Sequence, residues 1–308
     1  MEALWALVET ILNLTIPVGL AALGGYFSER GGIIQLGLEG MILISSFSSA
    51  AVTVLTHSVV LGVCAGLASA VVFSLLHGLS TIVFRSDQVI TGMALNFLAL
   101  GLTPVLCKAL FGIASSTPTL DTMHTISNVF VNFHGGFSPM LIILVVLVVL
   151  VSLNHKYGTF GLHLRFSGEH PEALESQGVS VNKVRWAGLF FTGICCGLAG
   201  IFLAIDHGSG FVRNMSSGRG FIALAALILA RWNPAWILFT ALIFGGIEGA
   251  QILLQGVEIG KGQTIPVQWI QLLPYAATLL VLALSPRFRQ SKSSSAPKRL
   301  GQPYPLAT

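Results

Sequence analysis

Five polar side chains interrupt the apolar stretches of this sequence, and they limit the chemistry that the chain can perform. Gln35 and Glu39 lie in "GGIIQLGLEGMILI", Asn96 in "GMALNFLALG", and Glu248 and Gln251 in "FGGIEGAQ". In a membrane such a group costs free energy, about 2.5–3.5 kcal/mol for Asp at a helix centre, so it faces a cavity or a polar partner. Because amides suit a neutral, hydroxyl-rich solute, we expect Gln35, Asn96, Glu248 and Gln251 to line a polar pathway. The alternative is hydrogen bonding between helices, at about 0.6 kcal/mol each.

Glu39 is expected to have a different role. It lies between two glycines in "GLEG", which allow close packing, so we predict that its carboxylate holds a broken helix through backbone N–H groups. Gly218 and Gly220 flank Arg219 before a short apolar run, a turn that favours a half-helix with its N-terminus aimed at the pathway. Glu39, Gly218 and Gly220 are therefore the predicted helix-break residues.

The sequence carries no motif for catalysis, metal binding or nucleotide binding. H-E-x-x-H, G-x-S-x-G and a close pair of intramembrane carboxylates are missing, and "GVEIGKG" at 256–262 lacks the spacing and hydroxyl residue of a phosphate-binding loop. His124 and His134 stand ten residues apart without carboxylates around them. The four cysteines have no C-x-x-C spacing and are expected to pack as small hydrophobes. We predict no catalytic residue, no metal and no cofactor bound by this chain.

Composition indicates a membrane protein. Only 9% of the 308 residues are charged, 54% are hydrophobic and the mean hydropathy is +0.82, whereas a soluble domain carries about 25% charged residues to solvate its surface. Each spanning helix needs about 20 apolar residues. We predict an all-α polytopic protein in contact with lipid, with about nine membrane segments at 4–26, 33–55, 58–84, 88–110, 138–154, 185–205, 220–231, 234–254 and 268–285. The segments 138–154 and 220–231 are short, which suggests short or broken helices that line a cavity.

The basic residues predict the orientation, because cytoplasmic loops carry an excess of Lys and Arg. The net charge of +4 is therefore a topology signal and does not indicate nucleic-acid binding. With the N-terminus outside and the C-terminus inside, four basic residues lie outside: Lys108, Arg213, Arg219 and Lys261. Twelve lie inside: Arg30, Arg85, Lys156, Arg165, Lys183, Arg185, Arg231, Arg287, Arg289, Lys292, Lys298 and Arg299. Residues 1–287 then form the membrane domain, and the Ser-, Pro- and Lys-rich residues 288–308 a disordered cytoplasmic tail.

The cytoplasmic loop at 155–185 contains a short predicted helix without a hydrophobic face of its own. Pro171 suits the first turn; Glu169, Glu172 and Glu175 cluster toward the positive end of the helix dipole; and Gly178 suits the position just past the helix end. Such a helix favours docking to a partner. The alternative is an ordinary solvated connection.

The segment "LRFSGEHPEALESQGVSVNKVR" resembles the coupling loop of ABC-importer permeases in the branched-chain amino acid, ribose and nucleoside superfamily. The likeness extends from about residue 16 to 285 and includes "ERGGIIQLGLEGMILI", "SDQVITGMALNFLALGLT", "GRGFIALAALILARWNP", "FGGIEGAQILLQ" and "QLLPYAATLLVLAL". The chain is most similar to the nucleoside-type permeases, which work with basic-membrane-protein-like binding lipoproteins. Gln35 stands where many relatives carry Asn, an exchange of one amide for another.

This resemblance implies a non-catalytic membrane subunit of an ATP-driven importer in a bacterial inner membrane. Two permeases, with a heterodimer favoured over a homodimer, would form the pathway for a nucleoside or, alternatively, a simple sugar or branched-chain amino acid. Two partner ATPases would hold ATP and Mg²⁺ at the cytoplasmic face, and a periplasmic or lipid-anchored binding protein would deliver the solute. The helix at 168–178 would dock in a cleft of the ATPase, with coupling residues Arg165, Gly168, Glu169, Pro171, Glu172, Glu175 and Gly178.

An ion-coupled secondary transporter is the alternative from a different class. It would need a carboxylate or histidine relay at the midplane of the membrane, for which only Glu39 and Glu248 are available. It would also leave the predicted docking helix unexplained.

Overall fold

The computed structural model describes residues 2–120, 138–255 and 296–304, together with seven single residues between 270 and 283. The elements in these ranges are helices, and one isolated β-bridge joins Ser116 to Val212. The helices are α1 (Glu2–Arg30), α2 (Leu38–Thr56), α3 (Val59–Gly78), η1 (Leu79–Val83), α4 (Gln88–Phe111), α6 (Pro139–Tyr157), α7 (Thr159–Glu169), α8 (Pro171–Ser176), α9 (Val181–Ile201), η3 (Phe202–His207), α10 (Arg219–Leu229) and α11 (Pro234–Leu254). η1 and η3 are π-helical continuations of α3 and α9.

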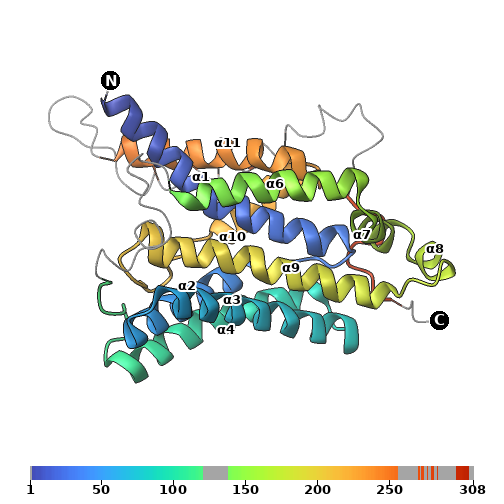
Figure 1. The fold of residues 1–308 in the computed structure, drawn as a ribbon, viewed down its shortest axis with the longest axis horizontal. Coiled ribbons are helices and arrows are strands. Elements are labelled where there is room, and N and C mark those ends of the chain that lie inside the picture. The colour runs from blue at the N-terminus through green and yellow to red at the C-terminus, as the bar shows by residue number, and fades with distance from the viewer. Residues whose placement is uncertain are drawn as a thin grey trace.

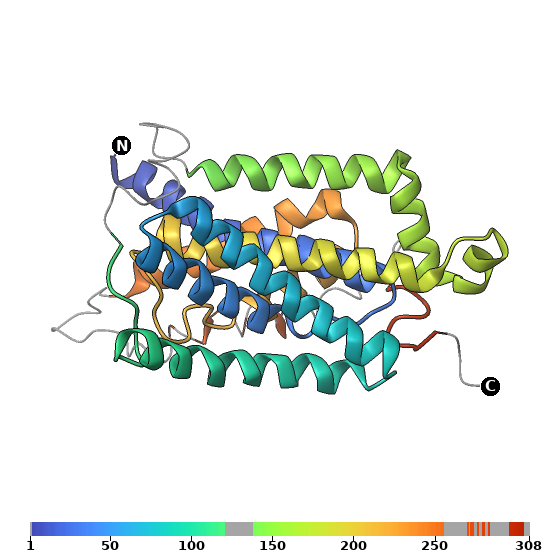
Figure 2. The same cartoon turned by 60° about the horizontal axis from the view of Figure 1, so that its bottom comes forward.

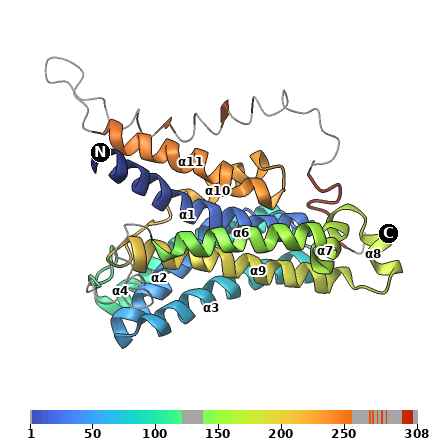
Figure 3. The ribbon, with the colours of Figure 1, turned by 45° about the horizontal axis from the view of Figure 1, so that its top comes forward.

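The long helices run roughly along the longest axis of the molecule, with α7 and α8 at one end (Figure 1). We call this the loop end, where residues 296–304 also lie, and we call the opposite end, which holds the N-terminus, the far end (Figure 3). The stretches containing α2 and α9 occupy the centre, since 78% of each apolar window is buried, against 28% for α4 and 22% for α6. α4 and α6 accordingly flank the bundle on opposite sides (Figure 2).

Seven helical stretches among the described residues are long and apolar enough to cross a membrane. Each overlaps one predicted segment: α1, α2, α3 with η1, α4, α6, α9 with η3, and α11. The 11-residue α10 is the short helix predicted at 220–231. The segment 268–285 falls mostly outside the described residues. The all-helical fold class is therefore confirmed for the described residues, while the count of nine segments and the orientation stay predictions.

The first helix is longer than its apolar run predicted. α1 continues past residue 26 to Arg30, because its last two residues are buried with polar partners. Trp232 Nε1 donates to the Glu29 carboxylate at 2.6 Å, and Arg30 Nη2 donates to Glu169 at 3.0 Å. A buried charge is tolerated when it is paired and hydrogen-bonded, so charged residues extend this helix instead of ending it.

The second helix begins later than predicted, at Leu38 instead of 33. Residues 31–37 form turns and irregular backbone, which we call the entry segment. Side chains satisfy part of its backbone: Gln88 Oε1 accepts the Ile34 N–H at 2.7 Å, and the His77 ring contacts the Ile34 carbonyl at 3.0 Å. Irregular backbone at membrane depth is tolerated when protein groups satisfy it in this way. α2 therefore starts inside the bundle.

Small side chains let α9 approach α2 closely. Ser45 donates to the Gly197 carbonyl at 2.8 Å, and Ser46 donates to the Gly200 carbonyl at 3.0 Å. A Cβ added to Gly200 would overlap the carbonyl oxygen of Ile42 and stand 2.7 Å from the Cβ of Ser45. Contacts between small residues are the usual basis of helix packing in membranes. This packing fixes α2, which carries Glu39, against the central helix of the bundle.

We expect Gly200→Ala to lower the free energy of unfolding by about 1–3 kcal/mol, the usual cost of overpacking. The measurement is the melting temperature of the purified protein in detergent. Gly246→Ala in α11 is the matched control, because nothing lies within 4 Å of a Cβ at that position. Equal melting temperatures for the two variants would contradict the close approach of α2 and α9.

Candidate functional site

The carboxylate of Glu39 joins two helix beginnings inside the bundle. Glu39 lies in the first turn of α2, and its two oxygens accept the backbone N–H groups of Gly218 and Gly220, each at 2.7 Å, at the start of α10. The Glu39 residue is buried, with 4% of its surface exposed. Because a helix N-terminus carries partial positive charge, one carboxylate counters the charge of two of them. This junction is the helix break.

Glycines make the helix break possible. Gly218 is the N-cap of α10 with a φ of 84°, a left-handed conformation that glycine adopts at little cost. A Cβ on Gly220 would overlap the backbone nitrogen of Glu39 and stand 2.6 Å from its Cα. The two chain segments therefore touch through their backbones. The structure brings together the three residues that the sequence assigned to a helix break.

Asn96 lies on α4 at the same start of α2. Its Oδ1 accepts the Gly40 N–H at 2.8 Å, and its Nδ2 donates to the Leu36 carbonyl at 2.8 Å. The residue is buried, and its amide satisfies backbone groups on both sides of the helix start. The amide oxygen and the amide nitrogen of Asn96 are therefore both hydrogen-bonded to the backbone of α2 and the entry segment.

Gln35, another predicted pathway residue, differs from Asn96 in the hydrogen bonding of its side chain. It lies in the entry segment and is fully buried. Neither its amide oxygen nor its amide nitrogen has a hydrogen-bond partner among the described residues. An unpaired buried amide costs about 1–3 kcal/mol, so this position is suited to a partner that the chain itself does not supply.

Glu248 and Gln251 lie on α11, and Glu248 is paired with a cation that sequence analysis missed. The Arg219 Nε stands 3.5 Å from Glu248 Oε2, and both side chains are mostly buried. Gln251 is half-buried, about one turn farther along the helix. The sequence analysis places Arg219 on the outside and gives it no role in the site, whereas in the structure it is the first residue of α10 and pairs with Glu248. Its place between two glycines, directly before an apolar run, was the available signal.

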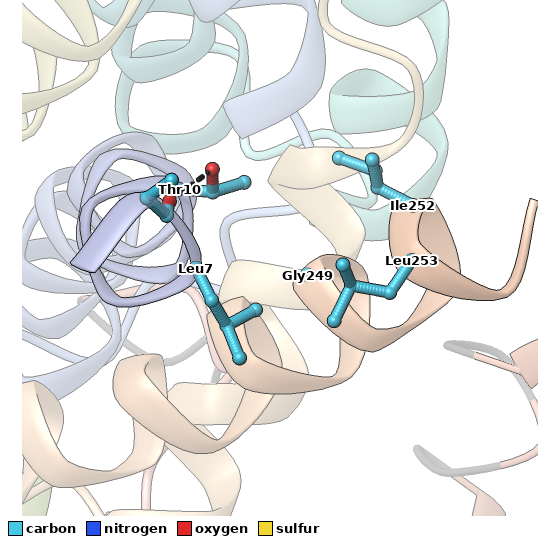
Figure 4. A pocket seen from close by; sticks show the side chains of 6 residues that line it. Leu7, Thr10, Gly249, Ile252 and Leu253 are labelled. Carbon is cyan, nitrogen blue, oxygen red and sulfur yellow. Dashed lines mark hydrogen bonds between the residues drawn. The ribbon is translucent and has the colours of Figure 1, made fainter. Parts of the chain in front are cut away.

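The surface between α1 and α11 holds a half-open crevice of about 260 Å³, lined by Ala6, Leu7, Thr10, Gly249, Ile252 and Leu253 (Figure 4). Its lining is mostly apolar. The Thr10 hydroxyl donates to the Ala6 carbonyl of its own helix at 2.8 Å. Because the four predicted pathway residues are not among its lining, we do not place the pathway there.

The loop at 155–185 contains two helices, where the sequence predicted one. α7 ends at Glu169 and α8 begins at Pro171, so the extent predicted for a helix at 168–178 is wrong. The residue before a proline is pushed away from the α conformation, and His170 accordingly has a φ of −146°. Pro171 occupies the first position of α8, and Gly178 follows its end with a φ of 78°, as predicted. Glu169 belongs to α7 and does not cap α8.

α7 is attached to the end of α1. Glu169 pairs with Arg30 at 3.0 Å and with Arg165, one turn earlier in α7, at 3.7 Å. The Ser167 hydroxyl donates to the Gly31 carbonyl at 3.0 Å. A crevice of about 260 Å³ on the surface of α7 is lined by Leu162, Arg165, Phe166 and Glu169. A movement of α7 would therefore act directly on the turn that leads into the entry segment.

Residues 296–304 differ from the disorder predicted for the tail. They form turns, and Arg299 and Tyr304 contact Glu172 and Glu175 of α8. The pKa of the Tyr304 phenol is raised, chiefly because its O–H donates to the Glu175 carboxylate. Composition suggested disorder because it does not reveal partners that lie more than a hundred residues away. The other residues of 288–308 lie outside the described part of the chain.

The sequence matches the family model described as "Branched-chain amino acid transport system / permease component" over residues 7–282. The chain belongs to this permease family. With seven long apolar helices among its described residues, the permease is a multi-pass membrane protein.

Three relatives show where the permease stands within this family. It is 32% identical to the guanosine ABC transporter permease protein NupQ of Bacillus subtilis, over 99% of this chain and 98% of the relative. It is 30% identical to the nucleoside ABC transporter permease protein NupC of Lactococcus lactis, over 92% and 93%. It is 28% identical to the putative glucose ABC transporter permease protein TsgC13 of Haloferax volcanii, over 96% and 97%. No solved structure matches the permease.

We expect Glu39→Gln to lower the free energy of unfolding by about 1–3 kcal/mol, because the amide NH₂ cannot accept and leaves one buried backbone N–H unpaired. The melting temperature in detergent measures this effect. Glu9→Gln, at an exposed position of α1, is the control. A normal melting temperature combined with lost transport would contradict the structural role of Glu39.

Proposed function

We propose that the permease is a membrane-spanning subunit of an ATP-binding-cassette importer and that it carries nucleosides by alternating access. The strongest support is the identity of 30–32%, over nearly the whole chain, to permeases named for guanosine and nucleosides. The sequence has no phosphate-binding loop. ATP and Mg²⁺ would therefore be bound by a partner ATPase, and this subunit would not be catalytic.

The loop end would face the cytoplasm of a bacterial inner membrane, and α7 and α8 would contact the ATPase. This orientation is supported by the excess of basic residues predicted for that side. Ala173 and Ser176 of α8 and Gln177 just past its end are exposed, and they offer a surface to the partner. The far end would receive solute from a periplasmic or lipid-anchored binding protein.

A second, related permease would complete the pathway. The chain is 32% identical to NupQ of Bacillus subtilis and 23% identical to a second permease of that organism, the guanosine ABC transporter permease protein NupP. It is 30% identical to NupC of Lactococcus lactis and 22% identical to a second permease of that organism, the nucleoside ABC transporter permease protein NupB. Because each organism has one more similar and one less similar permease, we favour a heterodimer over a homodimer.

The solute would meet Gln35, Glu248 and Gln251, while Asn96 holds the wall of the pathway through α2. The support is the buried Gln35 amide, which has no hydrogen-bond partner in the described part of the chain, since an amide offers both donors and an acceptor to the bases and hydroxyls of a nucleoside. The pairing of Glu248 with Arg219 leaves no net charge at that point. Such a wall suits a neutral solute.

A simple sugar is the second candidate solute, because the putative glucose permease of Haloferax volcanii is 28% identical over 96% of the chain. Sugars share the hydroxyl groups of the nucleoside ribose. A branched-chain amino acid is the third, from the description of the family.

Uptake of radiolabelled guanosine, uridine, ribose and leucine, in cells with and without the gene, tests the substrate. We expect only nucleoside uptake to fall, and we expect it to persist when the membrane potential is dissipated while ATP is maintained. Loss of ribose or leucine uptake instead would reassign the solute. Collapse of uptake together with the potential would overturn ATP coupling in favour of an ion-coupled secondary transporter.

We expect Ala173→Arg to reduce uptake about tenfold or more, the effect of about 1.4 kcal/mol lost at a contact. The long charged side chain would obstruct the ATPase, while the exposed position leaves the fold intact. Ala109→Arg, exposed at the far end of α4, is the control. Normal uptake by Ala173→Arg, with ATPase still bound, would contradict docking on this face of α8.

A further inference from the structure

Residues 296–304, which we call the tail segment, lie against α8 at the loop end (Figures 1 and 3). The Arg299 Nη2 donates to Glu172 Oε1 at 2.9 Å, and the Tyr304 hydroxyl donates to Glu175 Oε2 at 2.8 Å. Glu172 and Glu175 are three residues apart and so share one face of α8. Both carboxylates of α8 are therefore engaged by the tail segment.

Hydrogen bonds made by backbone groups of the tail segment tie it to three other elements. The Arg299 N–H donates to the Gly168 carbonyl at the end of α7, at 2.9 Å. The Gly301 N–H donates to the Gly32 carbonyl at the start of the entry segment, at 3.0 Å. The Arg185 side chain, near the start of α9, donates to the Gln302 carbonyl at 3.1 Å. A solvated tail would not make bonds to four separate elements.

Glycines give the tail segment room at the contacts. Gly32 has a φ of 93°, and a Cβ there would stand 3.0 Å from the Arg185 side chain and 3.5 Å from the Arg299 carbonyl. A Cβ on Gly168 would overlap the Arg30 carbonyl and lie 3.0 Å from Pro297, which is buried. The tail segment therefore packs closely against the backbone at Gly32 and Gly168.

The contacts form a continuous route from α8 to the helix break. Glu172 and Glu175 hold the tail segment, which is bonded to Gly32, and Gly32 is the second residue of the entry segment that leads to Glu39. Another face of the α8 region is open to solvent, because Ala173 and Gln177, the residue just past the end of the helix, are exposed and four residues apart. The tail segment and a partner on that open face would thus use different sides of the same helix.

We propose that the tail segment transmits movement of α8 to the entry segment, with Arg299 and Tyr304 as positioning residues for coupling. The proposal rests on the proposed function, in which α8 contacts an ATPase. It assigns the tail segment to the transmission machinery of the transporter, and it excludes a role as a competitor for the ATPase surface.

The first test compares two truncations in the assembled transporter in native membranes. Deletion of 296–308 should lower uptake by roughly tenfold, within the usual range of coupling free energies, while the ATPase stays bound and still hydrolyses ATP. Deletion of 305–308 is the control and should transport normally. Unchanged uptake after the longer deletion would overturn the proposal. So would a rise in uptake or in ATP hydrolysis, which would indicate an autoinhibitory strap, or release of the ATPase, which would indicate a docking element.

The second test is a charge exchange that a general loss of folding would not imitate. Arg299→Glu should reduce uptake, and the double variant Arg299→Glu with Glu172→Arg should restore it. Lys298→Glu is the matched control, because Lys298 is the exposed neighbouring base. Tyr304→Phe removes only the hydroxyl and should reduce uptake less than Arg299→Glu does. Failure of the double variant to recover uptake, at normal membrane levels, would contradict the pairing.

A third readout separates this proposal from the proposed function. A nitroxide spin label on Lys298→Cys should be immobile in the intact chain and become mobile when Glu172→Arg is added. This measurement requires neither substrate nor ATPase. An immobile label in a protein that transports none of the four solutes would refute the proposed function and leave the tail contact standing. A label that is mobile in the intact chain would refute the tail contact itself.

Discussion

The bond between the Glu39 carboxylate and the first N–H groups of α10 is the interaction on which the rest of the interior depends. Two helices begin inside the bundle, and each beginning leaves N–H donors without intrahelical partners and a partial positive charge. In an apolar interior neither can be left to water. One carboxylate satisfies donors of α10 from the first turn of α2. A neutral side chain would supply the acceptor without the compensating charge.

The helix break gathers the irregular backbone segments at one place inside the bundle. The entry segment, the start of α2 and the start of α10 converge on Glu39, and Asn96 closes the same junction from α4. The buried amide of Gln35 and the Arg219–Glu248 pair belong to the same elements or their immediate neighbours. In secondary transporters, broken helices with polar groups at their ends form the solute site. The geometry is thus organised around one carboxylate that need not touch solute.

At the loop end, two attachments run to the entry segment. α7 is joined to the end of α1 through Glu169 and Arg30, and the tail segment joins α8 to Gly32. The two attachments meet the chain at Arg30 and Gly32, two residues apart, on the stretch that leads to Glu39. Movement at the surface of the loop end would therefore act on the interior through a short stretch of backbone. The packing of small residues between α2 and α9 holds α2, the helix that follows this stretch, against the centre of the bundle.

The sequence by itself determined the membrane class, the all-helical fold of the described residues and the position of seven stretches long and apolar enough to span a membrane, because a long apolar run is a local property. It also singled out Glu39, Gly218 and Gly220. The tertiary structure alone decided which groups these residues meet, since Glu39 and the backbone N–H donors of Gly218 and Gly220 are about 180 residues apart. The tertiary structure also decided the contacts of α7, the length of α1 and the order of the tail segment, which depends on distant carboxylates. Burial and pairing of polar groups are decided by the whole fold, and composition cannot report them.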